Sequence, residues 1–145
     1  MKYRLISQIL GIGLVIFSLF QLLPVLLALI YQEESYISFI YSFLITLASG
    51  LFLIAVNFNK DYEDLRIRDG FLLTVLLWFT YSVFASLPFI IGKSGELSIV
   101  NAYFEAVSGL TTTGASILTD LDTELKSILF YLSLIHIWRC RRLRT

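Results

Sequence analysis

Three long stretches of uncharged, mostly apolar sequence constrain the fold of this chain more than any other feature. They cover residues 5–32, 35–59 and 70–92. Each is longer than the roughly 20 apolar residues that a helix needs to cross the hydrocarbon core of a bilayer. Because an isolated segment in lipid satisfies its backbone polar groups only as a helix, the stretches predict three spanning helices. Their expected bounds are residues 5–30, 36–58 and 71–91.

The composition supports a membrane protein and argues against an enzyme. Hydrophobic residues make up 57% of the chain and charged residues 15%, whereas about a quarter of a soluble domain is charged. The single His136 and the single Cys140 provide no disulfide and almost no material for zinc binding or His-based catalysis. The first stretch is too long for a signal-peptide core. We therefore expect a protein without catalytic residues or a cofactor.

The positive charges predict how the helices are oriented. Lysine and arginine precede the first span and separate the second from the third, at Lys2, Arg4, Lys60, Arg66 and Arg68. The turn at Glu33 and Glu34 contains neither. The positive-inside rule therefore places the N-terminus in the cytoplasm and residues 92–98 outside.

A fourth apolar stretch, residues 97–119, is interrupted near its middle by Glu105 and by a block of poor helix formers. That block is Gly109, Thr111, Thr112, Thr113 and Gly114. In a water-soluble helix it would cost about 3–4 kcal/mol relative to alanine. Ser98 is a suitable N-cap for a helix over residues 99–109, whose length of about 16 Å is half a membrane. We therefore favour a re-entrant helix and loop, with a plain fourth span as the alternative.

Several acidic residues near this stretch allow two interpretations each. Glu105 either braces the loop through backbone amides or is a solvated acid in a vestibule. Asp120, Asp122 and Glu124 form either an ordinary solvated loop, which we favour, or a field that concentrates cations. Irregular backbone at membrane depth requires surrounding protein or a water-filled cavity, so re-entry predicts protein beyond this chain.

Other features of the apolar stretches have plain structural interpretations. Pro24 predicts a kink in the first helix. Gly11 and Gly13 form too short a pattern for a dimerisation face. The aromatic residues within the third span are expected to serve helix packing; these are Trp78, Phe79 and Tyr81.

Four motifs resemble those of the Trk-type potassium uptake proteins, the TrkH/TrkG branch of the Trk/Ktr/HKT superfamily. They are Arg68-Asp-Gly-Phe71, Leu87-Pro-Phe89, Tyr103-Phe-Glu-Ala-Val-Ser-Gly-Leu-Thr-Thr-Thr-Gly-Ala-Ser116 and Lys126-Ser-Ile-Leu-Phe-Tyr131. The resemblance covers about residues 1–131. It implies an all-α membrane fold in which four pseudo-repeats of helix, pore helix and helix surround one pore.

The resemblance also implies how the chain is divided. Residues 1–70 are the branch's extra N-terminal helix pair with a cytoplasmic loop, and residues 71–131 are the first pore repeat. Within this repeat the expected parts are the outer helix 71–91, the pore helix 99–109, the filter 110–115 and the start of the inner helix at 126–131. The chain is then truncated within that inner helix.

The threonine-rich loop is the candidate ion site. A permeating potassium ion must exchange its hydration shell for rings of oxygens. Backbone carbonyls of Thr111, Thr112, Thr113 and Gly114 are suited to supply one quadrant of such rings. Gly114 permits a backbone angle that a β-carbon resists, and the negative end of the preceding helix favours a cation. The plainer alternative is a threonine-rich turn that follows a fourth span.

The function implied by the resemblance is potassium uptake across a prokaryotic plasma (inner) membrane by a channel-like transporter of the symporter class. It also implies a homodimer gated by a cytosolic nucleotide-binding subunit, contact with membrane lipid, and no nucleic acid partner. The transported potassium ion is the only ligand expected. The alternatives are a small multi-span interaction or assembly protein and a non-functional truncated gene fragment.

The C-terminal stretch, residues 132–145, departs from the family. An arginine cluster begins at Arg139 and leaves only twelve uncharged residues from Ser127, too few to cross a bilayer. The sequence Leu132-Ser-Leu-Ile-His-Ile137 also resembles a translated sequencing adapter. We therefore expect this tail to be non-native, with a basic membrane anchor as the alternative, and expect no function of His136 or Cys140.

Overall fold

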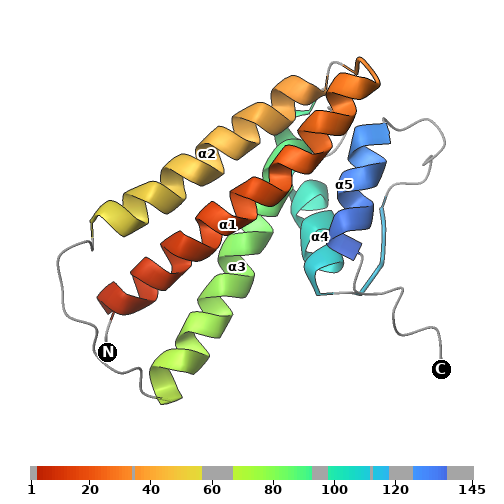
Figure 1. Cartoon of the computed structure of the whole chain (residues 1–145). Helices are drawn as coiled ribbons and strands as arrows, with labels where there is room; N and C mark the ends of the chain where they lie inside the picture. The colour runs from red at the N-terminus through yellow and green to blue at the C-terminus, as the bar shows by residue number, and fades with distance from the viewer. Residues whose placement is uncertain are drawn as a thin grey trace, which may run out of the picture.

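The described part of the chain folds into five helices, arranged as a bundle of three long helices and two short ones (Figure 1). The computed structural model describes residues 3–33, 35–56, 67–92, 98–111, 113–117 and 126–136. Their helices are α1 Tyr3–Ile30, α2 Tyr36–Ala55, α3 Ile67–Ile91, α4 Ile99–Leu110 and α5 Lys126–His136. All regular structure in the described residues is helical, which confirms the expected all-α class.

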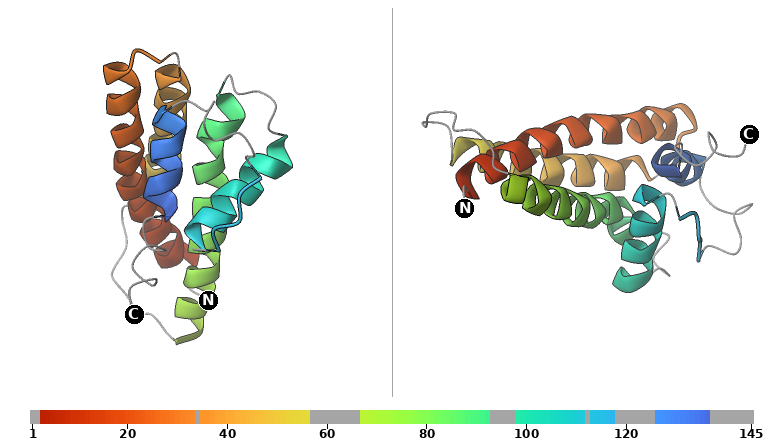
Figure 2. Two further views of the ribbon diagram at one scale, coloured as in Figure 1. Left: turned by 90° about the vertical axis from the view of Figure 1, so that its right-hand side faces the viewer. Right: turned by 90° about the horizontal axis from the view of Figure 1, so that it is seen from below.

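Helices α1, α2 and α3 are long and apolar enough to cross a membrane. Helix α1 continues through Pro24 without interruption, and α3 begins at Ile67, four residues before the expected start. Helices α1 and α2 form an antiparallel hairpin. Figure 2 shows α4 at the edge of the bundle away from this hairpin, where it contacts α3 and α5.

Glycines allow α1 to approach both of its long neighbours. A β-carbon on Gly11 would lie 2.8 Å from the carbonyl oxygen of Gly50 in α2. The Tyr81 hydroxyl of α3 fills the space that a side chain at Gly13 would need. The Tyr81 ring stacks on Phe17, with the ring centroids 5.2 Å apart. The two glycines therefore pack within the chain, and Tyr81 has the packing role expected of it.

The other aromatic residues expected to pack in α3 behave differently. Trp78 is 48% exposed and Phe79 is 61% exposed. Trp78 lines an apolar groove of about 670 Å³ bordered by α1, α3, α5 and the end of α4. Phe79 is therefore mostly exposed in the described part of the chain, and aromatic composition alone does not say which face of a helix is covered.

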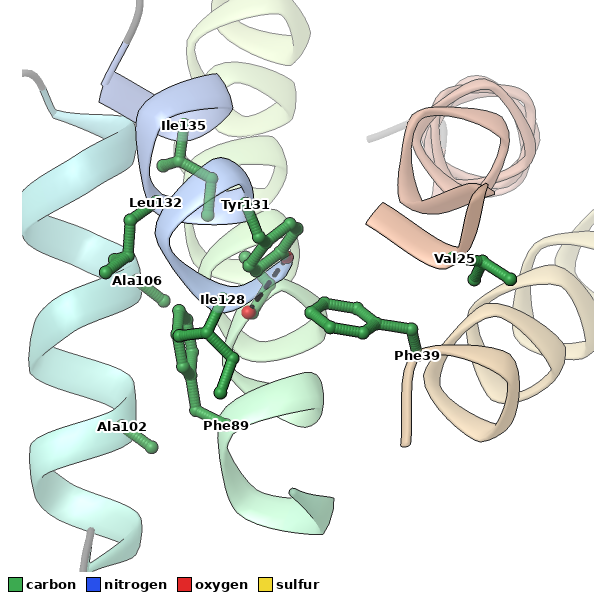
Figure 3. Close-up of a cluster of buried hydrophobic side chains, with 10 residues drawn as sticks. Val25, Phe39, Phe89, Ala102, Ala106, Ile128, Tyr131, Leu132 and Ile135 are labelled. Atoms are coloured by element: carbon green, nitrogen blue, oxygen red, sulfur yellow. Dashed lines mark hydrogen bonds between the residues drawn. The ribbon is translucent and has the colours of Figure 1, made fainter. Parts of the chain in front are cut away.

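The main core lies where α3, α4 and α5 meet (Figure 3). Ala102 and Ala106 of α4 are fully buried, and their small size allows α5 to approach closely. The ring of Tyr131 contacts Phe39 and Phe89, each with a centroid separation of 5.5 Å. This core joins the short helices to the long ones and positions the loop that follows α4.

Helix α5 continues into the stretch suspected of being non-native. It runs to His136, and within it Leu132 and Ile135 are buried against the core. The arginine cluster and Cys140 lie outside the described residues, as does the side chain of His136.

Pro88 creates a local backbone problem in α3 that a side chain of α1 solves, and a side chain of α5 bonds the backbone next to it. Proline has no N–H, so the carbonyl of Phe84, four residues earlier, has no helical donor. The side-chain amide of Gln21 donates to that carbonyl at 3.4 Å. The Tyr131 hydroxyl donates to the adjacent carbonyl of Ala85 at 3.0 Å. Helices α1 and α5 therefore both contact α3 at the proline.

Gln21 is fully buried and also links α1 to α2. Its Oε1 accepts hydrogen bonds from the hydroxyls of Ser42 at 3.2 Å and Thr46 at 3.5 Å. A buried polar group inside a membrane protein is costly unless it is paired. The side-chain amide of Gln21 in α1 thus hydrogen-bonds α2 through its oxygen and α3 through its nitrogen, and so couples the three helices.

We predict that replacing Gln21 with leucine destabilises the bundle by about 1 kcal/mol, the scale of an interhelical hydrogen bond in a membrane. The loss should be smaller in a Pro88→Ala background, because the backbone N–H regained at position 88 then bonds the Phe84 carbonyl. Denaturant titration of both single variants and the double variant in micelles, followed by circular dichroism, measures this coupling.

Gln8→Leu is the matched control, since it changes the same residue type elsewhere in α1. Its effect should not depend on residue 88. If Gln21→Leu lowered the free energy of unfolding equally in the Pro88 and Pro88→Ala backgrounds, Gln21 would not be compensating for the missing N–H of Pro88.

Candidate ion-binding loop

Helix α4 begins and ends where the sequence predicts. The Ser98 hydroxyl accepts a hydrogen bond from the Asn101 N–H at 3.3 Å, so it is the N-cap. The helix ends at Leu110, one residue beyond the expected Gly109. Its 12 residues correspond to about 18 Å, close to half the thickness of a membrane.

The chain reverses direction immediately after α4. The Ser108 carbonyl accepts hydrogen bonds from the N–H groups of Thr113 at 3.0 Å and Gly114 at 3.3 Å. Gly114 has a φ of 71°, the left-handed conformation that glycine was expected to permit there. Residues 113–117 then run back beside α4 in extended form (Figure 2). A single helix through residues 98–111 and 113–117 is therefore excluded.

Ser108 fixes the loop through its side chain as well as its carbonyl. Its hydroxyl donates to the Ala115 carbonyl at 2.6 Å. Sequence analysis overlooked this residue. The signal was available, because carbonyls in the last turn of a helix lack helical donors and a serine there offers a second hydrogen-bonding group.

Glu105 braces the returning arm of the loop. Its side chain is 1% exposed, and its Oε2 accepts a hydrogen bond from the Ile117 N–H at 3.1 Å. The two interpretations left open by the sequence are thereby decided: Glu105 is a buried brace and not a solvated vestibule acid.

The threonine hydroxyls hold the beginning of the loop. The Thr111 hydroxyl lies 2.7 Å from the Val107 carbonyl, to which it donates, and 2.8 Å from the Thr113 hydroxyl. The hydroxyls thus hold neighbouring backbone in place. Thr112 lies outside the described residues.

The hydrogen-bonded N–H groups determine the direction of one carbonyl. In a planar trans peptide the N–H and C=O point in opposite directions. Because the Gly114 N–H points at the Ser108 carbonyl, the Thr113 carbonyl of the same peptide unit points away from the end of α4. That α4 terminus carries partial negative charge, so the surroundings of the loop favour a cation over an anion.

The loop and the outer face of α4 are largely uncovered. Thr111 and Thr113 are exposed, and Ile99 and Val100 are 69% and 75% exposed. Among the described residues, no group of three or more His, Cys, Asp or Glu could hold a metal ion. The acids expected near an outer mouth, Asp120, Asp122 and Glu124, lie outside the described residues.

A family model described as "Cation transport protein", TrkH, matches residues 36–139. The chain is 41% identical over 131 residues to the Trk system potassium uptake protein TrkH of Escherichia coli K12. It is 34% identical over 130 residues to TrkG of the same organism. Each alignment covers 90% of this chain and 27% of the relative, so the chain spans about a quarter of the length of these relatives.

A solved structure is also similar, namely the crystal structure of the potassium transporter TrkH from Vibrio parahaemolyticus. The TM-score is 0.87 and the sequence identity is 38%. The alignment covers 93% of this chain and 29% of that chain. The helices and the reversing loop therefore have the arrangement of one part of a larger membrane protein.

We predict that Glu105→Leu releases the returning arm of the loop. Leaving a buried N–H without its acceptor costs about 1–3 kcal/mol, so exchange of the Ile117 amide hydrogen should accelerate roughly tenfold or more. Residue-resolved hydrogen exchange in micelles checks this. Phe104→Leu, on the exposed side of the same helix, is the control. Unchanged exchange at Ile117 in Glu105→Leu would contradict the bracing role.

Proposed function

The chain belongs to the TrkH family of cation transport proteins, and we propose that it supplies one wall of a potassium uptake pore in a prokaryotic plasma membrane. The observation that carries this proposal is the reversing loop. A half-length helix ends, the backbone turns through Gly114, and Ser108 and Glu105 engage the N–H groups that follow. This arrangement leaves the Thr113 carbonyl directed away from the helix, where a cation has access to it.

The chemistry of the proposal is dehydration of a monovalent cation. A potassium ion gives up water only if several oxygens replace it at the same time. The carbonyls of Thr111, Thr112, Thr113 and Gly114 provide a row of such oxygens on one side of the ion. Neither a cofactor nor a catalytic step is involved, because the potassium ion is cargo.

The remaining walls would come from three similar loops in the rest of a full-length protein. The uncovered loop and the exposed Ile99 and Val100 support this, since irregular backbone at membrane depth requires protein around it. The longer relatives are named potassium uptake proteins. The homodimer and the cytosolic nucleotide-binding subunit implied by the resemblance belong to the same proposal.

The proposed orientation places the N-terminus in the cytoplasm, with α4 entering from the outer side. Lys and Arg flanking the α1–α2 hairpin support this through the positive-inside rule. A Thr113→Cys variant in a Cys140→Ser background should therefore react with an impermeant thiol reagent from the outer side only. Reaction from the inner side alone would reverse the orientation. Protection from both sides would favour the small interaction protein instead.

We predict that Gly114→Val strongly reduces cation uptake through the proposed pore. A β-branched residue at a φ of 71° is strained by about 1–3 kcal/mol, so the backbone turn and its carbonyls should move. The measurement is rubidium uptake in cells lacking potassium uptake systems. They express a chimaera in which the 131 matched residues of this chain replace the corresponding segment of the E. coli relative.

Ile117→Val is the matched control, because it keeps the N–H that bonds Glu105 and changes an exposed side chain. The control should retain uptake near that of the parent chimaera, while Gly114→Val should lose at least tenfold. Normal uptake by Gly114→Val would contradict a role of this loop in the ion path.

A further inference from the structure

The turn between α1 and α2 is held in one conformation by its own backbone. The N–H of Gln32 donates to the Leu29 carbonyl at 3.3 Å, and the N–H of Glu33 donates to the Ala28 carbonyl at 2.9 Å. Together these bonds form a Schellman motif. Gln32 has a φ of 53°, a conformation unfavourable for a residue other than glycine. The chain thus accepts backbone strain immediately before Glu33.

The carboxylate of Glu33 contacts the first turn of α5, more than 90 residues later. Its Oε1 accepts a hydrogen bond from the Lys126 N–H at 2.9 Å, and its Oε2 accepts one from the Ser127 N–H at 3.1 Å. These N–H groups have no partners within α5, because the first turn of a helix lacks acceptors for them. The negative charge also suits the positive end of the helix.

Two further contacts join the same two segments, and a third, within the turn, holds Ser35 against Glu33. The hydroxyls of Ser35 and Ser127 lie 2.7 Å apart, and the Ser35 hydroxyl donates to Glu33 Oε2 at 3.4 Å. The Lys126 ammonium lies 4.4 Å from the centre of the Tyr31 ring. Partial burial raises the pKa of Glu33, but the hydrogen bonds from Ser127, Lys126 and Ser35 outweigh it and lower the pKa below its usual value. The carboxylate is therefore charged at neutral pH.

Helix α5 in turn packs directly on α4. Ile128 and Leu132 of α5 lie in the core with Ala102 and Ala106 of α4 (Figure 3). The α4 residues that hold the reversing loop, Glu105 and Ser108, lie in the same helix. Contacts that fix the start of α5 therefore also constrain the position of α4 and of the loop that follows it.

We propose that Glu33 is a positioning residue, which clamps the first turn of α5 to the α1–α2 turn and thereby holds α4 and its loop in place. The clamp consists of Tyr31, Glu33 and Ser35 on one side and Lys126 and Ser127 on the other. It gives the N-terminal helix pair a role in the geometry of the neighbouring pore repeat. The part of the inference that concerns ions rests on the function proposed above.

The direct test is amide hydrogen exchange of the whole 145-residue chain in micelles. Removing a helix-capping acceptor typically costs enough to speed local exchange about tenfold. Glu33→Ala should therefore accelerate exchange at Lys126 and Ser127, and Glu33→Gln, which keeps one acceptor oxygen, should have a smaller effect. Lys126→Met keeps the backbone N–H and should leave its protection intact. Unchanged exchange in Glu33→Ala, or an equal effect of Glu34→Gln, would overturn the clamp.

The pH dependence of amide exchange distinguishes a clamp that needs the charged Glu33 carboxylate from one that depends on packing alone. Because the pKa of folded Glu33 lies below that of the unfolded chain, the clamp is at full strength above about pH 4.3 and weakens as the pH falls through the folded pKa. Among the described residues, the other titratable side chains beside the carboxylate are those of Lys126 and Tyr31, and Glu34→Gln controls for the neighbouring acid. Protection at Ser127, corrected for intrinsic rates, should fall as the pH is lowered from about 6 to about 3 in the wild type and not in Glu33→Gln. A flat wild-type profile would contradict the inference.

The effect of the clamp on ion uptake is measured in the chimaera. Glu33→Ala should raise the rubidium concentration for half-maximal uptake several-fold more than Glu34→Gln does. If the parent chimaera fails to restore uptake, the proposed function fails while the exchange data still decide the clamp. If uptake is restored but Glu33→Ala leaves its concentration dependence unchanged, the clamp does not position the loop.

Discussion

The structure depends on finding hydrogen-bond partners for backbone groups that no helix or sheet satisfies. The loop after α4 shows this most directly. Its reversal leaves the N–H groups of residues 113, 114 and 117 without helical acceptors, and in a membrane protein such groups are costly. The Ser108 carbonyl and the Glu105 carboxylate accept all three. The same contacts determine which way the loop carbonyls face, so stability and the proposed ion chemistry have one origin.

The same requirement recurs at two other points among the described residues. Pro88 deprives the Phe84 carbonyl of its helical donor, and Gln21 supplies one from α1. The first turn of α5 has N–H groups without helical acceptors, and Glu33 supplies those acceptors from the α1–α2 turn. In each case a polar side chain of the N-terminal helix pair serves the neighbouring repeat. The pair is therefore connected to the repeat by directional bonds as well as by apolar contact.

The sequence was most informative where structure depends on neighbouring residues. Apolar length predicted the three long helices, Ser98 predicted the start of α4, and Gly114 predicted the reversal, because each depends on local backbone chemistry. Glu105 could be recognised as unusual, but its role depended on where Ile117 lies. Gln21 and Glu33 provided no signal, since their partners are more than 60 residues away and no spacing rule connects them. The sequence also did not indicate which face of α3 other helices cover, as the exposed side chain of Phe79 illustrates.

The central claim is that the backbone after α4 replaces water around a monovalent cation. The most direct measurement is anomalous diffraction from thallium or rubidium in crystals of the full-length chimaera. A peak is expected within coordination distance of the Thr113 carbonyl oxygen and the neighbouring carbonyls of the loop. A fully occupied ion path elsewhere, with no peak beside residues 111–114, would contradict it.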